Sequence, residues 1–336
     1  MPVVAGATSC FPRFFLFFAG RGLRTYRQKA MRIKTLDAPP GRSFRQVFVM
    51  AYKELNYNDP LRLGGATAFF TIFSLPAILL VAVNALGIVF NKEIISGEIF
   101  KEIRDVVGEG ATRQVRLVFN NMEELVWHWV YTVAGFLFMI FIATTLFIVV
   151  QRSINQIWNV QVKEGQRALA HLRHRFTALL LILISGSLVV AALVSDVFLA
   201  FAWGWLQKSA PAYDVFLLLL LNQVLTLGII TVWFAVLFRY LPDVWMAWRA
   251  IWFGAGLTAV LFSLGKFILR QLLVNSNLNS IYGAAGSVIL LLLFIFYSSF
   301  ILYYGAAFTK AYAEYARLPF QVKPFAEEYE IKMVEK

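Results

Sequence analysis

The stretch "SIYGAAGSVILLLLFIFYSSF", residues 280–300, contains no acidic or basic residue and is apolar over most of its length. A run of about 18 or more such residues predicts a helix that crosses a lipid bilayer. At its start, Tyr282 is followed by small residues, among them Gly283 and Gly286. Because small side chains let helices approach closely, this end predicts a member of a packed bundle rather than a lone anchor. A gap that admits an acyl chain between helices is the alternative interpretation.

Similar apolar runs recur along the whole chain of 336 residues, which is 60% hydrophobic and 15% charged. Each run is long enough to cross a hydrocarbon core about 30 Å thick, and backbone groups in lipid must be satisfied within the segment. We therefore expect an all-α polytopic membrane protein, a six-transmembrane-helix bundle with amphipathic N-terminal helices and an extracytoplasmic helical hairpin. The six runs are Leu63–Phe90, Leu125–Val150, Phe176–Leu206, Val215–Phe238, Ala250–Leu269 and Ala284–Phe308.

The net charge of +12 is distributed unevenly between the segments that connect these runs. Alternate connections and the two ends collect 23 of the 31 Lys and Arg residues, and the other connections hold 8. This asymmetry predicts that both termini lie in the cytoplasm. The basic surplus therefore indicates topology, with anionic lipid headgroups rather than nucleic acid as its partner. The single cysteine, Cys10, cannot form an internal disulfide bond.

Three regions follow from this map: a basic cytoplasmic N-terminal region (1–62), the transmembrane domain (63–308) and a cytoplasmic C-terminal tail (309–336). Residues 21–34 fit either an interfacial helix on an anionic leaflet or a disordered basic tail. After the break at 37–41, the apolar spacing in 43–55 predicts an amphipathic helix along the membrane.

The connection 91–124 is the one long extramembrane segment between the expected spans. Two apolar stripes at helical spacing flank the glycines at 108–110, which predicts two short amphipathic helices with a hinge. They either cap the bundle as a static hairpin or form a moving lid at its outer mouth.

Two charged residues fall inside the apolar runs, Asp196 in the third and Lys266 in the fifth. A charge in lipid is costly, so Asp196 is expected to face the bundle interior or a wet cavity. Helix rise places both in the outer half of the membrane, which allows an ion pair between them. Asp196 is a candidate proton or cation site or a headgroup contact, and the alternative places it at the outer water interface. Pro76 and Pro242 are candidate packing or hinge positions.

Motifs for catalysis are not evident in the sequence. Three histidines and one cysteine give no plausible zinc set, and the chain contains no P-loop, GxSxG or HExxH motif. We therefore expect no enzymatic activity, no metal and no cofactor.

Four stretches together resemble a known family, in the same order along the chain. They are "LGGATAFFTIFSLPAILLV" (63–81), "INQIWNV" (154–160), "FRYLPDVWMAWRAIWFGA" (238–255) and "SIYGAAGSVILLLLFIFYSSFILYYGAAF" (280–308). The chain resembles the YihY/virulence factor BrkB family of bacterial inner-membrane proteins, once labelled ribonuclease BN. Two departures are that Pro76 lies one position earlier than in the family pattern and that Ala307 replaces its usual glutamate. The resemblance implies a multi-pass protein of the bacterial inner membrane and a role in lipid movement within the cell envelope.

Our leading functional hypothesis is a lipid-handling or lipid-transporting protein. Bases beside the expected spans are candidate headgroup or phosphate contacts: Arg152, Arg167, Arg173, Arg175, Arg239 and Arg249. Two other hypotheses are a scaffold that docks an envelope partner through residues 91–124 and a proton- or cation-coupled transporter of a small solute. The sequence leaves the substrate and the oligomeric state, including a homo-oligomer, open.

Overall fold

The computed structural model describes residues 44–88, 91–124, 129–165, 167–206, 213–275 and 284–329. The expected helix at 21–34 and the positions Tyr282 and Gly283 lie outside these residues, and the surroundings of Gly286 are not described. The elements run in the order α2 (Phe44–Tyr57), α3 (Pro60–Leu86), α4 (Lys92–Glu124), α5 (Trp129–Ile157), β1 (Val160–Val162), α6 (Arg167–Leu206), α7 (Tyr213–Tyr240), β2 (Val244–Met246), α8 (Trp248–Asn275), α10 (Ala284–Tyr315), β3 (Phe320–Val322) and β4 (Ala326–Glu328).

Six helices of the described chain are long and apolar enough to cross a membrane, which confirms the expected polytopic all-α class. The spanning segments are Pro60–Leu86, Leu137–Ile157, Ala170–Ala192, Leu220–Tyr240, Trp248–Ile268 and Val288–Tyr315. Several of these helices extend past the uncharged runs. For example, α5 continues through the buried Gln151 and α10 through the buried Lys310, because both side chains find polar partners.

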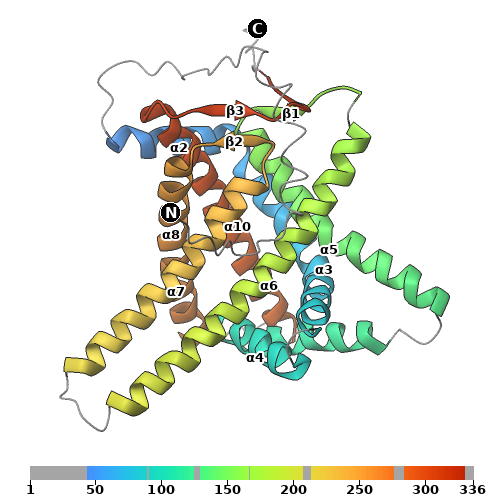
Figure 1. The fold of residues 1–336 in the computed structure, drawn as a ribbon, viewed down its shortest axis with the longest axis vertical. Helices are drawn as coiled ribbons and strands as arrows, with labels where there is room; N and C mark the ends of the chain where they lie inside the picture. Colours follow the sequence, from blue (N-terminus) through green and yellow to red (C-terminus); the bar gives the residue numbers. More distant parts are fainter. Residues whose placement is uncertain are drawn as a thin grey trace, which may run out of the picture. The chain divides into compact units, whose positions relative to one another are not determined.

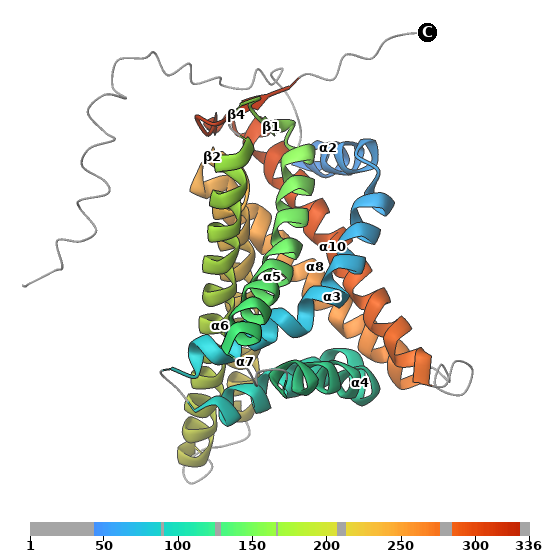
Figure 2. The same ribbon diagram turned by 90° about the vertical axis from the view of Figure 1, so that its right-hand side faces the viewer.

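The two ends of the bundle carry different elements (Figures 1 and 2). One end, the strand end, bears α2 and the short strands, and α4 lies across the opposite end. The amphipathic helix expected over 43–55 is α2, which buries Val47, Ala51 and Leu55 against the bundle, with Phe48 5.0 Å from Phe308 between ring centroids.

The connection 91–124 forms two helical arms that meet at Gly108, where φ is 83° and ψ is 168°. This left-handed backbone favours glycine, so the hinge expected from the sequence is present. The arms bury Ile95, Ile99 and Phe119 among their apolar residues. Contacts with α3, α6, α8 and α10 place α4 across the ends of the spans.

The chain after residue 308 differs from the expected tail. The helix α10 continues to Tyr315, and β3 and β4 then pair antiparallel with β2 and β1 respectively. The C-terminal segment therefore ties together the connections on either side of α6 and α7. Strands of three residues with distant partners leave no periodic signal in the sequence, which is why the expectation was a tail.

The helices α8 and α10 approach each other closely in their parts next to the strand end. A Cβ atom on Gly254 would lie 1.8 Å from Thr309 Oγ1, and one on Gly305 would lie 1.8 Å from Thr258 Oγ1. Each helix thus receives a threonine of the other in the space left by a glycine, the small-residue packing that membrane helices favour. Pro76 lies buried inside α3, which continues as a helix on both sides of it.

Candidate functional site

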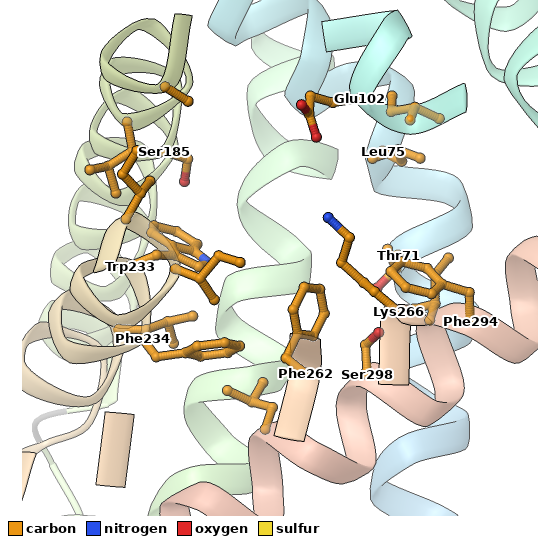
Figure 3. Close-up of a pocket in the computed structure, with 18 of the residues that line it drawn as sticks. Thr71, Leu75, Glu102, Ser185, Trp233, Phe234, Phe262, Lys266, Phe294 and Ser298 are labelled. Atoms are coloured by element: carbon orange, nitrogen blue, oxygen red, sulfur yellow. The ribbon is translucent and has the colours of Figure 1, made fainter. Parts of the chain in front are cut away.

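A cavity of about 840 Å³ lies within the membrane domain, and all six spans and α4 contribute to its lining (Figure 3). Its walls are mostly apolar and aromatic, and they include Trp233, Phe234, Phe262 and Phe294. This volume and lining are typical of sites for amphiphilic or apolar ligands, which combine an apolar wall with a few polar groups.

The charged side chains that the structure describes in the lining come from α4 and α8. Lys266 comes from α8, and α4 contributes Glu98, Lys101 and Glu102. Glu98 and Lys101 form an ion pair with 2.8 Å between Oε1 and Nζ. Lys266 extends toward the side of the cavity where Glu102 lies (Figure 3). The structure therefore places Lys266 in the lining of the cavity.

The second intramembrane charge, Asp196, lies in α6 one helical turn beyond Ala192, which lines the cavity. The structure describes the backbone of Asp196 but not its side chain. Its expected ion pair with Lys266 therefore stays a prediction.

Hydroxyl groups also line the cavity, mainly from α3, α6, α7 and α10. Most of those with a described partner donate to a carbonyl oxygen of their own helix: Thr67 to Leu63, Thr71 to Thr67, Ser185 to Leu181 and Ser299 to Ile295. Ser298 differs, because its Oγ is buried and has no hydrogen-bond partner. A buried hydroxyl without a partner is costly and is often matched by a ligand or water.

The arginines expected to contact phosphate are mostly engaged within the protein. Arg152 Nη2 lies 2.7 Å from His171 Nε2, and Arg175 donates to Thr144 Oγ1 at 2.8 Å while its guanidinium covers the Phe141 ring. These contacts give the arginines a packing role at the ends of α5 and α6.

Arg173 and Arg239 have similar engagements, with their guanidinium carbons 4.7 Å from the Phe325 ring and 5.2 Å from the Trp248 ring. Arg249 is exposed at the start of α8. The side chain of Arg167 is outside the described residues.

A second polar cluster, the Asp243 network, was not singled out from the sequence. Asp243 is 1% exposed in the turn before β2, and its carboxylate accepts hydrogen bonds from Asn155 Nδ2 at 2.8 Å and Gln151 Nε2 at 3.2 Å. His174 Nε2 lies 3.2 Å from the same carboxylate, and Lys323 Nζ lies 4.0 Å away. Pro242 supplies its carbonyl oxygen to Lys323 Nζ.

Burial lowers the pKa of Lys323 to about 8, with Arg173 and Arg239 acting in the same direction and Asp243 opposing them. The network joins α5, α6, the turn before β2 and the C-terminal segment at the strand end. The signal in the sequence was the acid within "LPD" and two amides one turn apart, Gln151 and Asn155, whose partners lie in distant segments. We assign the network a structural role.

Among the residues that the structure describes, no group of three or more His, Cys, Asp or Glu side chains could hold a metal ion. What the described geometry offers is a mostly apolar cavity with a charged region near α4, and a closed polar network at the strand end.

Comparisons with known proteins agree with this architecture. The chain is 26% identical over 189 residues to a protein named "UPF0761 membrane protein" of Tolumonas auensis, an alignment that covers 55% of this chain and 58% of that protein. It is 31% identical over 182 residues to a protein of the same name in Verminephrobacter eiseniae, which covers 52% of this chain and 40% of that protein. The aligned part thus spans about half the length of these relatives.

No solved structure matches the chain. The profile of the family described as Virulence factor BrkB matches residues 51–327, from α2 through β4. This match covers all six spans, α4 and both small sheets, and the chain therefore belongs to the Virulence factor BrkB family.

Proposed function

We propose that this protein binds a membrane lipid inside its helix bundle and moves it across the bilayer. The observation that supports this proposal is the cavity of about 840 Å³, bounded by all six spans and lined mainly by apolar side chains. An acyl chain that moves from the bilayer into such a lining stays in apolar surroundings, so it avoids the cost of about 0.8 kcal/mol for each methylene exposed to water. A polar solute of similar size gains nothing comparable from these walls.

The extent of the cavity along the membrane favours transport over a shallow binding groove. On α7 its lining runs from Asn222 to Leu237, which is about 22 Å along a helix. The hydrocarbon core of a bilayer is about 30 Å thick, so the lining follows most of that distance. At the strand end, the paired strands and the Asp243 network join the connections between spans.

Reconstituted vesicles test this function directly. The full-length protein is placed in liposomes that carry a trace of phospholipid with a fluorescent headgroup, and a membrane-impermeant reductant reports the fraction in the outer leaflet over time. We expect the wild-type protein to raise the rate of exchange between leaflets at least tenfold above protein-free vesicles.

A bulky side chain in the cavity should block this exchange. Thr226→Trp fills the lining on α7, and Val224→Trp places the same side chain on the exposed surface of that helix, where Val224 is 57% exposed. We expect Thr226→Trp to lower the rate at least fivefold and Val224→Trp to leave it unchanged. Wild-type protein that exchanges no lipid, or equal effects of the two variants, would contradict the proposal.

A further inference from the structure

The charged region of the cavity points to the headgroup that the cavity accepts. Among the side chains that the structure describes, four ionisable ones line it, Glu98, Lys101 and Glu102 on α4 and Lys266 on α8. Two are acids and two are bases, so their formal charges cancel. A net anion gains little from such a region, whereas a ligand with one positive and one negative group can contact both kinds of side chain.

Two of the four side chains are already matched to each other. Glu98 and Lys101 lie three residues apart on α4 and form the 2.8 Å ion pair. That leaves Glu102 and Lys266, which come from different helices and face the same space (Figure 3). Among the residues that the structure describes, neither has an ion-pair partner.

The two remaining side chains differ in what they can bind. In Figure 3 the ammonium of Lys266 points toward Glu102 and away from Ser298, whose Oγ is buried. A lysine ammonium suits a phosphate oxygen, because it supplies a point charge and three donors. The carboxylate of Glu102 accepts hydrogen bonds only, which suits a primary ammonium group.

We infer that the cavity selects a zwitterionic phospholipid with a primary amine, whose phosphate is held by Lys266 and whose ammonium is held by Glu102. The acyl chains then lie against the aromatic wall formed by Trp233, Phe262 and Phe294. This inference rests on the proposed function and adds the chemical class of the lipid to it.

Competition binding tests the inference on the full-length protein in a neutral detergent. Native mass spectrometry reports which lipid the protein retains from equimolar phosphatidylethanolamine, phosphatidylcholine and phosphatidylglycerol. We expect the wild-type protein to retain phosphatidylethanolamine about tenfold over the other two, as expected for one additional charge-assisted contact.

Each substitution should change this preference in its own way. Lys266→Gln should weaken retention of phosphatidylethanolamine and phosphatidylglycerol together, by about tenfold. Glu102→Gln should abolish the preference for phosphatidylethanolamine over phosphatidylglycerol while retention of phosphatidylglycerol persists.

Matched controls are available on the same chain. Lys53→Gln on α2 and Glu93→Gln on α4 remove exposed charges that do not line the cavity, and they should leave retention unchanged. Asp196→Asn tests whether the acid one turn beyond Ala192 recognises the lipid ammonium instead. If Asp196→Asn abolishes the preference for phosphatidylethanolamine and Glu102→Gln does not, the assignment of Glu102 is overturned. Millimolar phosphoethanolamine should not displace the lipid, and displacement would overturn a lipid ligand in favour of a soluble one.

The outcomes separate this inference from the function on which it rests. Wild-type protein that retains no phospholipid and exchanges none in vesicles would contradict both. Wild-type protein that exchanges lipid but retains the three phospholipids equally, with no effect of Lys266→Gln or Glu102→Gln, would contradict the headgroup assignment alone.

Discussion

Lys323 and Asp243 show how single residues hold the strand end together. The carboxylate of Asp243 is almost fully buried, and two amides, an imidazole and an ammonium surround it. Burial of a charge is costly unless partners compensate it, and here they come from three segments that are distant in sequence. Lys323 also donates its backbone N–H to the Asp243 carbonyl at 3.0 Å, so the residue is held through both its main chain and its side chain.

Lys323 gives the protein a stability that depends on pH. Burial, the largest cause, lowers its pKa to about 8 from the ordinary 10.5, so between these values the folded protein binds fewer protons than the unfolded chain. Stability rises with pH wherever the unfolded state binds more protons, so the cost of burying a charged Lys323 is present below pH 8 and is relieved as pH rises toward 10.5.

Thermal unfolding in detergent at several pH values measures this effect against Lys323→Met, which has no titrating group. The stability of the wild type relative to the variant should increase by about 1–2 kcal/mol from pH 7.5 to pH 9.5. A difference that is constant with pH, or that falls, would show that folding does not lower the pKa of Lys323.

At the scale of secondary-structure elements, contacts between residues distant in sequence hold α8 and α10 together. Their apolar surfaces do not drive association in lipid, where tails are as apolar as leucine, so close packing has to supply the energy. This close packing occurs at two levels of the helix pair, where Gly254 meets Thr309 and Gly305 meets Thr258. The sequence motifs containing "FGA" and "YYGAA" include these glycines, but which helix each one meets is a property of the packing.

Gly305→Ala should therefore destabilise the protein. Its new methyl group would lie 1.8 Å from Thr258 Oγ1, and overpacking of this kind costs about 1–3 kcal/mol. Gly256→Ala is the matched control on α8, since a Cβ there meets nothing within 4 Å and alanine favours the helix.

The measurement is the thermal unfolding midpoint of the purified variants, followed by loss of the monodisperse peak in size-exclusion chromatography. Removing the opposing hydroxyl in Gly305→Ala/Thr258→Ala should restore part of the loss. Equal midpoints for Gly305→Ala and Gly256→Ala would contradict this description of the helix contact.

For the molecule as a whole, the order of the six spans places α4 at one end of the bundle and the strands at the other (Figure 1). The asymmetry in basic residues predicts that the strand end is cytoplasmic. In a variant that lacks Cys10, a new cysteine at Glu109 in α4 should react with an impermeant maleimide from outside the cell. A cysteine at the exposed Glu164, in the turn after β1, should react only after lysis. Reaction of both from the same side would overturn the topology.

The amino-acid sequence by itself determined that lipid surrounds six helices, and it indicated a break in 91–124 and an amphipathic helix before the first span. These features depend on local composition and periodicity, which a single segment carries in full. The tertiary structure alone decided that residues 320–328 pair with two distant connections and that Asp243 meets Lys323. It also decided that Lys266 and Glu102 face one cavity. Such contacts join residues far apart in the chain, and their energy exists only once the helices have packed.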